Sequence, residues 1–581
     1  MNMFAGSCKL DKVFPYPDVL PEDERETLRM IIPQATKLYK ELNDPLKNDQ
    51  NESVDEKVVE RMKGIGAFGV MVPTEYDGAG MTATQFARLG EVIGGNDLGI
   101  SVFLGAHQSI GYKGLVLYGT DAQKEKYLRD LATGQKIAAF CLTEPGSGSD
   151  ASSIKTRATL SANGKHWILS GNKIWISNGG IADVMTVFAK TTVKHAKTGE
   201  DVDKVTAFFV ERAFGGVTNG PAEKKMGIKC SNTTEVYFDN TPVPVENVIG
   251  QVGDGFKVAM NILNSGRFGM IAALTGSMRH LISKATDHVT NRVQFGSKIS
   301  TFGGIQEKIA RMTMLHYVGE SLAYMVAGNM DRGAKDFQLE AAVGKIFASE
   351  AAWAVADETI QILGGMGYMR DAGVEKFLRD IRIFRIFEGT NDILRLFIAL
   401  TGLQYTGSHL KELQRAMKNP VANLGMIFDQ GTKRVFRAVG ITTGPGLSEH
   451  VAPALATSAN LVSKAIPNFA STVEQLLIKY NKDIIHEQML LNNLANAAIE
   501  IYISTVLLSR ATNSINHKFK SAAHETLIVN TYIAEAMERV ERNLSATKST
   551  PRLQLNKNLK EIAEYVYEGQ GIAHVHPIDQ E

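Results

Sequence analysis

The sequence of 581 residues is short of several features that mark particular classes of protein. Its three cysteines, Cys8, Cys141 and Cys230, are too few for a disulfide framework and match no zinc or redox spacing, which favours a reducing compartment. The 63 basic and 62 acidic side chains leave a net charge of +1, so no electrostatic attraction to nucleic acid is expected. The histidines are scattered and no H-E-x-x-H occurs, which indicates no metal site.

Long apolar runs are also missing. No window of 18 apolar residues occurs, and the nearest candidate, residues 489–509, is interrupted by Asn492, Asn493, Asn496 and Glu500, so it predicts a buried or amphipathic helix. The N-terminus is acidic and has neither an apolar signal-peptide segment nor an Arg-rich amphipathic stretch. If the protein works in an organelle, we expect its targeting peptide to be absent from this chain.

What is present is a hydrophobic period that changes along the chain. Helical spacing holds from about residue 21 to 136, short β-type runs then flank the hairpin signal Asn163-Gly164, and the helical period returns after Gly255. A helix is expected to start at Asn391-Asp392 and to break at Thr401-Gly402. The patterns predict an α+β chain, mostly α, with an N-terminal helical domain (1–137), a middle β-barrel-like domain (138–250), a helical bundle domain (251–402) and an additional C-terminal helical domain (403–581).

Glycine-rich segments are the first candidates for ligand binding. Residues 78–83 and 146–151 both satisfy G-x-G-x-x-A, but neither lies in a βαβ unit, so a Rossmann fold is not expected. Residues 140–150, Phe-Cys-Leu-Thr-Glu-Pro-Gly-Ser-Gly-Ser-Asp, follow a short apolar strand and offer backbone N–H groups and hydroxyls that suit a phosphate or a polar ring edge. A plain glycine-rich turn explains this segment equally well.

Two further segments carry candidate functional side chains. Trp175 and Ser177 are two apart in a predicted strand, so an indole could stack on a flat ring while the hydroxyl bonds its edge, although core packing is the more common role. Glu388 follows Ile386 and Phe387 and precedes a helix start. Apolar surroundings would raise the pKa of its carboxyl, as a base working near neutral pH requires, whereas an acid that only complements the helix dipole is the more common interpretation.

Taken together, these segments resemble the acyl-CoA dehydrogenase family. Residues 141–150 look like its first signature, and residues 361–380, with a Gly-Gly-x-Gly core, look like its second. Residues from about 42 to 403 follow the family order. The C-terminal extension and the run that starts at Phe387 are similar to the very-long-chain branch of the family in particular.

The resemblance implies bound FAD and assigns its contacts in this chain. The flavin and pyrophosphate set is Phe140, Cys141, Leu142, Thr143, Ser149, Trp175, Ile176 and Ser177, together with Thr390, Asn391 and Asp392. In the family the adenosine end is held by the partner subunit, so a homodimer is implied. The residues that match this second set are Arg292, Gln294, Phe295, Gln361, Gly364 and Gly365.

The resemblance also implies a reaction, the α,β-dehydrogenation of a long-chain or very-long-chain acyl-CoA to the trans-2-enoyl-CoA. Glu388 matches the family's catalytic base, and the alternative base position, directly before Arg267, is occupied here by Gly266. The electron acceptor would be electron-transferring flavoprotein, and the location mitochondrial, at the matrix face of the inner membrane. The residues that match substrate contacts are Ser101, Gly105, Ser149, Asn264, Arg267, Phe387 and Gly389.

Other interpretations stay open at this point. A paralogous branch of similar length assists assembly of respiratory complex I, and nitroalkane or acyl-CoA oxidases share the flavin signatures. A basic amphipathic pattern after residue 403 suits an anionic membrane surface and suits equally a solvated helix face packed on its own domain. The basic residues of this pattern are Lys411, Arg415, Lys418, Lys433, Arg434 and Arg437.

Overall fold

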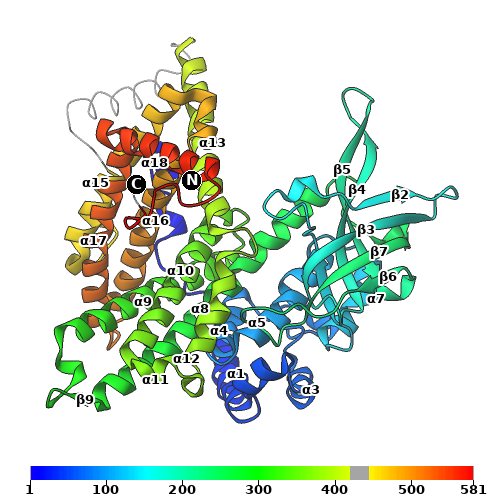
Figure 1. The fold of residues 1–581 in the computed structure, drawn as a ribbon, viewed down its shortest axis with the longest axis horizontal. Helices are drawn as coiled ribbons and strands as arrows, with labels where there is room; N and C mark the ends of the chain where they lie inside the picture. The colour runs from blue at the N-terminus through cyan, green and yellow to red at the C-terminus, as the bar shows by residue number, and fades with distance from the viewer. Residues whose placement is uncertain (1, 419–443, 580–581) are drawn as a thin grey trace. The chain divides into compact units, whose positions relative to one another are not determined.

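The computed structural model describes residues 2–418 and 444–579, with side chains described for residues 2–408 and 444–579. The chain divides into two compact units, one of Pro17–Asn391 and one of Met1–Tyr16 with Asp392–Glu581. The N-terminal helical part therefore begins at Pro17 in the structure, because residues 1–16 cluster with the C-terminal helices. The predicted class, α+β and mostly α with a sheet domain in the middle, is confirmed (Figure 1).

Seven short helices precede the sheet. Side-chain caps fix where several of them start: Thr82 and Gln85 form a capping box on α4, Thr120 and Gln123 form one on α7, and Asp97 accepts from the N–H of Gly99 in α5. A π-helical turn, η4 (Ala106–Gly111), follows α5 directly. The helices are α1 (Glu22–Glu41), α2 (Pro45–Asn51), α3 (Glu56–Gly64), α4 (Ala83–Gly94), α5 (Leu98–Gly105), α6 (Lys113–Tyr118) and α7 (Asp121–Ala132).

The middle domain is one eight-stranded sheet with the order β6-β7-β3-β2-β4-β5-β8, and β1 pairs with β4 off this path. The predicted Asn163-Gly164 hairpin joins β2 to antiparallel β3, while β1 and β4 are parallel. Separate apolar clusters cover its two faces. The strands are β1 (Ala138–Cys141), β2 (Arg157–Leu160), β3 (His166–Ser177), β4 (Val184–Lys194), β5 (Asp201–Glu211), β6 (Val217–Asn219), β7 (Thr233–Pro244) and β8 (Val248–Ile249).

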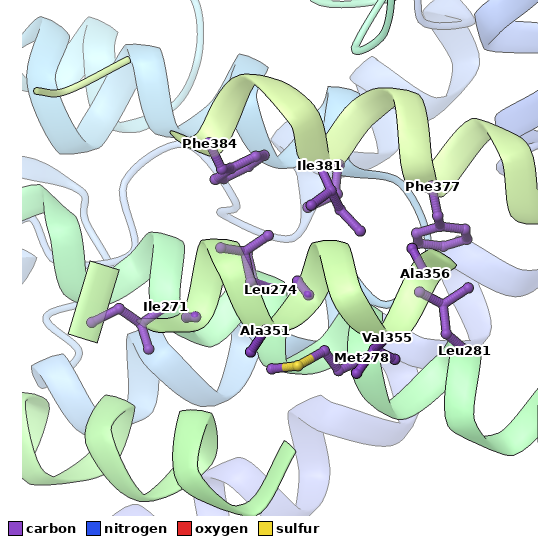
Figure 2. Close-up of a cluster of buried hydrophobic side chains, with 14 of the residues drawn as sticks. Ile271, Leu274, Met278, Leu281, Ala351, Val355, Ala356, Phe377, Ile381 and Phe384 are labelled. Carbon is purple, nitrogen blue, oxygen red and sulfur yellow. The ribbon is translucent and has the colours of Figure 1, made fainter. Parts of the chain in front are cut away.

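A helical bundle follows the sheet. Figure 2 shows its core, where Leu274 and Met278 of α8, Val355 of α10, and Ile381 and Phe384 point toward one another. The bundle elements are α8 (Gly255–Asn291), the hairpin β9 (Val293–Gln294) and β10 (Ser297–Lys298), α9 (Gly303–Asp331), α10 (Gln338–Leu363), α11 (Gly365–Tyr368), α12 (Val374–Ile381) and the 3-10 turn η10 (Arg382–Arg385).

The predicted helix break at Thr401-Gly402 is wrong, because α13 (Asn391–Lys418) runs through it. Glycine normally weakens a helix by about 1 kcal/mol, which is why the pair suggested an end. Here the missing side chain makes room for packing: a Cβ on Gly402 would lie 2.2 Å from Cε1 of Phe4. Phe4 is buried in the same unit and meets Phe469 edge to face, with ring centroids 4.9 Å apart.

In the described part of the C-terminal unit, residues 444–579, four α-helices follow. The interrupted apolar run 489–509 lies within α16, and most of that helix is buried, as predicted. Within the described parts of the chain, no helix is both long and apolar enough to cross a membrane. The four helices are α15 (Ala456–Tyr480), α16 (Gln488–Asn516), α17 (Ala522–Lys548) and α18 (Thr550–Glu568).

Candidate active site

Glu388 occupies the loop between η10 and α13, in an unusual backbone conformation. Its φ of 53° is left-handed, and Gly389 follows with a φ of 90°. A non-glycine residue adopts this region rarely, and when it does the strain is often found at functional positions. The side chain is partly buried, and its Oε2 is shielded from solvent without a hydrogen-bond partner in the described residues.

The electrostatics of Glu388 fit the expectation from its apolar neighbours. Burial raises the pKa of this carboxyl from 4.5 to about 7, while Arg267 and Lys345 act in the opposite direction. A carboxyl whose pKa is near 7 is half ionised near neutral pH and can both take and hold a proton there. The dipole-complementing interpretation, an exposed helix-start acid, does not account for this burial.

Two buried cations hold the backbone on which Glu388 is carried. Arg267 of α8 donates from Nη2 to the Glu388 carbonyl oxygen at 3.1 Å and also to the side chain of Asn264. Lys345 of α10 donates from Nζ to the Gly389 carbonyl oxygen at 2.7 Å. The sequence analysis did not identify Lys345. The available signal was a lone charge within the small and apolar stretch of residues 341–348.

The expected flavin loop follows β1, and most of its glycine- and serine-rich part is exposed to solvent. Cys141 and Leu142 bury their side chains, so only their backbone groups can face a ligand. Ser149 is exposed, and a Cβ added to Gly146 or Gly148 would meet no atom within 4 Å. No side chain therefore crowds the backbone at these two glycines, which leaves room for a phosphate or a ring edge.

Trp175 differs from the simple strand alternation that the sequence suggested. The register of β3 against β7 shifts between Lys173 and Ile176, and Trp175 has a φ of 57°. This bulge turns the indole outward, so its side chain is 62% exposed although Ile176 beside it is buried. Core packing, the more common role of such a tryptophan, is excluded, and a broad aromatic face is available for stacking.

A buried ion pair braces the flavin loop from behind, and the sequence analysis missed it. Lys173 is fully buried and donates to Glu144 at 2.7 Å, to the Leu142 carbonyl at 3.2 Å and to the Phe188 carbonyl at 2.8 Å. Glu144 also accepts from the N–H of Thr156 at 3.0 Å. The pair therefore fixes the residues on both sides of Thr143, which lies within the first signature.

Asn178 joins three parts of the predicted site. It directly follows Ser177, and its Nδ2 donates to the Phe103 carbonyl of α5 at 3.1 Å and to the Ala138 carbonyl of β1 at 3.3 Å. The end of the Trp175 strand, the flavin loop and the expected acyl helix are thus held together. Sequence spacing gave no sign of this, because the partners lie 75 and 40 residues away.

The expected acyl helix, α5, has room at the predicted position. Ser101 and Gly105 are one helical turn apart, and a Cβ on Gly105 would have no neighbour within 4 Å. A small cavity lies nearby, between the turn after α5 and helix α8. Its lining includes Phe86, Ser109, Lys113, Ser265 and Phe268.

The residues matched to the adenosine end lie elsewhere in the same unit. Figure 1 shows β9 at the end of the bundle away from the sheet domain. Phe295 is 96% exposed, and Arg292, Gln294, Gln361, Gly364 and Gly365 are all exposed as well. One copy of the chain therefore does not bring this set to the flavin loop. Asn391, which was matched to the flavin set, is engaged within the bundle: its side chain accepts a hydrogen bond from Lys345 and donates to Ser349 and Glu350.

Four family models match successive parts of the chain. They are the acyl-CoA dehydrogenase N-terminal domain at residues 25–135, the middle domain at 139–241, the C-terminal domain at 253–403, and the ACAD9/ACADV C-terminal domain at 453–572. They cover the expected helical, sheet, bundle and extension regions in that order.

Whole-chain comparisons agree with these models. The mitochondrial very long-chain specific acyl-CoA dehydrogenases of Rattus norvegicus and Homo sapiens are each 54% identical over 579 residues, which is 100% of this chain and 88% of theirs. A solved acyl-CoA dehydrogenase of Bacillus anthracis, complexed with FAD, has a TM-score of 0.80 at 29% identity and covers 99% of both chains. Butyryl-CoA dehydrogenase of Megasphaera elsdenii has a TM-score of 0.61 at 34% identity over 66% of this chain and 98% of its own. The chain belongs to the acyl-CoA dehydrogenase family.

Proposed function

We propose that this protein is an FAD-dependent acyl-CoA dehydrogenase that introduces the trans-2 double bond into long-chain and very-long-chain acyl-CoA, with Glu388 as the catalytic base. The observation that carries the proposal is the environment of Glu388: a carboxylate oxygen with no hydrogen-bond partner among the described residues, burial that brings its pKa to about 7, and a backbone fixed by Arg267 and Lys345. A carboxylate held in this way is suited to removing a proton from a bound substrate.

The α C–H of a thioester is a very weak acid, so removing its proton requires help from the carbonyl side. The N–H of Glu388 itself has no acceptor among the residues that the structure describes. By family resemblance, this N–H donates to the thioester oxygen as enolate charge develops. A fixed donor of this kind lowers a barrier by roughly 3 to 4 kcal/mol in related oxyanion sites. When bound, FAD supplies the acceptor for the hydride that leaves the β carbon.

The residues of the chain fit a flavin. The exposed indole of Trp175, the hydroxyl of Ser149 and the open backbone around Gly146 and Gly148 provide an aromatic face, a donor and a cradle that side chains would otherwise fill. Phe140 to Thr143 would meet the polar edge of the ring and Ser177 its N5 region. The Lys173–Glu144 pair keeps this loop in place.

Preference for long acyl chains rests on α5. Ser101 and Gly105 are small, and the space beside Gly105 is free for an acyl tail. Each methylene removed from water contributes about 0.8 kcal/mol, so a channel that admits a few more carbons changes discrimination strongly. We expect the best substrates to have roughly 14 carbons or more, an estimate from this transfer energy and from the family resemblance.

A homodimer, electron transfer to electron-transferring flavoprotein and a mitochondrial location at the inner membrane belong to the same proposal. The dimer is supported by the exposed Phe295 set, which would complete the adenosine site of a second copy. The mitochondrial location is supported by relatives named as mitochondrial. The basic pattern from Lys411 to Arg437, proposed for membrane contact, falls outside the residues whose side chains are described.

Anaerobic bleaching of the flavin tests the function directly. The wild type mixed with palmitoyl-CoA should lose its absorbance near 450 nm, whereas Glu388→Gln should bind FAD and acyl-CoA but not bleach. Bleaching by Glu388→Gln would assign the base elsewhere, and absence of bleaching in a flavin-loaded wild type would reject the dehydrogenase.

The same preparation separates the alternatives. Rapid reoxidation of the reduced flavin by oxygen would indicate an oxidase. Full-length relatives at 54% identity favour the dehydrogenase over the complex I assembly factor. Co-purification with complex I intermediates, together with absent turnover, would reverse that preference.

A further inference from the structure

We propose that Lys345 is a positioning residue for this reaction: its buried ammonium fixes the loop that presents Glu388 and keeps a positive charge beside the carboxylate. The inference rests on the proposed function, because it assumes that Glu388 is the base. It concerns a residue in the middle of α10, 43 positions before Glu388 in the sequence and outside both signature segments.

Two hydrogen bonds of Lys345 reach the short segment that follows Glu388. The side chain is 1% exposed, and Nζ lies 2.7 Å from the Gly389 carbonyl oxygen and 3.0 Å from Oδ1 of Asn391. Asn391 is held in turn, donating to Ser349 at 3.0 Å and to Glu350 at 3.0 Å. The ammonium therefore clamps the two residues that connect Glu388 to the first turn of α13.

The hydrogen bonds of Lys345 act on a backbone segment with an unusual conformation. Glu388 and Gly389 both have positive φ, a conformation that is unfavourable for an L-residue such as glutamate and persists only when its surroundings fix it. Arg267 fixes the carbonyl of Glu388 from α8, and Lys345 fixes the carbonyl of Gly389 from α10. The two hydrogen bonds hold the loop from two different helices. They therefore fix the orientation of the Glu388 carboxylate and of its backbone N–H.

A stabilising role alone does not require a lysine at this place. A buried charge is costly, and an apolar side chain of similar size often serves packing equally well. The neighbours of Lys345 along α10, residues 341–344 and 346, are apolar and buried. A charge in this setting is explained by what it faces: the ionisable carboxyl of Glu388, the backbone carbonyl of Gly389 and the side-chain amide oxygen of Asn391.

The charged groups around Glu388 give the proposal a measurable signature. Arg267 from α8 and Lys345 from α10 both favour its ionised form, and Glu350 of α10 accepts a hydrogen bond from the Asn391 side chain. Among the described residues, removing the charge of Lys345 leaves Arg267 as the cation that favours the ionised carboxyl. The carboxyl should then bind its proton more tightly, and the rate of proton removal should rise only at higher pH.

The test is the pH dependence of flavin reduction in single turnovers, measured anaerobically with palmitoyl-CoA on the flavin-loaded enzyme. Lys345→Met keeps the length and removes the charge, and Lys345→Gln is a second neutral variant that can still donate to a carbonyl. Both should shift the apparent pKa of the rate upward by roughly one unit, as expected for loss of a nearby charge. The limiting rate should fall about tenfold or more, with substrate affinity changed much less, since a misdirected base affects the chemical step.

Two further variants separate positioning from loss of structure. Lys345→Arg retains the charge and should keep the pH profile of the wild type while reducing the limiting rate. Lys376→Met removes another buried lysine, one that pairs with Asp97 and Asp380 and has no bond to the Glu388 loop; it should lower stability without moving the profile.

The outcomes are distinguishable. If neither neutral variant at Lys345 moves the profile, or if Lys376→Met moves it as much, the positioning role is rejected although the function stands. If the wild type itself is not bleached by acyl-CoA, the proposed function fails first. If Lys345→Met does not fold, Lys345→Gln decides on the same criterion.

Discussion

At the scale of single residues, the main feature of the site is that an ionisable carboxyl, Glu388, is held in surroundings that disfavour its charge. Glu388 would ionise readily in water, yet the structure places it where burial opposes its charge. Arg267 and Lys345 hold the left-handed backbone that carries it. Such a residue is expected to serve reactivity at a cost to stability.

The first residue-scale prediction concerns activity and pH. Because the pKa of Glu388 is raised to about 7, the base is protonated and inactive well below this value. The rate of flavin reduction should therefore rise with pH through about 7 and level off above it. Stopped-flow reduction between pH 5.5 and 9 checks this, and a rate that is flat across that range would contradict the assignment of Glu388.

The second concerns stability. With its folded pKa at about 7 and its ordinary value at 4.5, Glu388 binds more protons in the native than in the unfolded state, so its contribution to stability falls as pH rises between these values. Glu388→Gln has no charge to bury and should be more stable than the wild type at pH 8, by up to roughly 3 kcal/mol. The difference in melting temperature should shrink toward pH 5. A difference that is constant with pH would point to packing instead.

At the scale of elements, several candidate site residues lie where helices and strands end. The flavin loop leaves β1, the Trp175 bulge lies near the end of β3, and Asn178 ties both to α5. The site is thus assembled from junctions between elements, where the backbone is not committed to helix or sheet and can face a ligand.

One element-scale prediction tests α5 as the wall of the acyl channel. Gly105→Glu adds a side chain where a Cβ fits without a clash, so the protein should fold. Its carboxylate would then block the channel or lie unpaired in apolar surroundings. Activity with 16-carbon acyl-CoA should fall at least tenfold relative to an 8-carbon substrate, given about 0.8 kcal/mol per excluded methylene. An unchanged chain-length profile would show that the tail does not pass this helix face.

A second tests the brace behind the flavin loop. Lys173→Met leaves Glu144 and two carbonyl oxygens without their buried cation, a change that costs roughly 3 to 5 kcal/mol in comparable sites. FAD should dissociate faster, measured by the recovery of flavin fluorescence. Arg157→Met, which removes an exposed ion pair with Asp203 in the same sheet, is the control and should have little effect. Equal FAD release by both variants would argue against a brace.

At the scale of the whole molecule, the chain forms two units, and one of them uses both ends of the sequence. The proposed catalytic residues lie in Pro17–Asn391, and the first sixteen residues belong with the C-terminal helices. Phe4 is central to that arrangement, since its ring is 2% exposed and occupies the space left by Gly402 beside Phe469.

The corresponding prediction is that Phe4→Ala destabilises the C-terminal unit by about 3 to 5 kcal/mol, the usual cost of deleting a buried aromatic ring. Limited proteolysis, with cleavage sites mapped by mass spectrometry, should show faster cleavage within residues 392–579. Phe519→Ala, at a ring that is half exposed, should not have this effect. Cleavage unchanged from the wild type would mean that residues 1–16 do not stabilise this unit.

Much of the fold could be predicted from the sequence, because the type of each secondary-structure element depends largely on local residue patterns. Periods of 3.6 and 2 residues gave the order of helical and strand regions, and the Asn163-Gly164 turn gave a hairpin. The same patterns failed at Thr401-Gly402, because a glycine that ends a helix and one that admits the ring of Phe4 are identical in sequence.

The site divides in the same way. Glu388, Trp175 and the glycine-rich loop stand in contiguous motifs, so the sequence by itself determined their candidacy. Tertiary structure alone decided how they are held: the converging donors Arg267 and Lys345, the Lys173–Glu144 brace and the outward turn of Trp175. The physical reason is that a hydrogen bond across 121 or 44 residues depends on where two helices cross, and no local pattern encodes that distance.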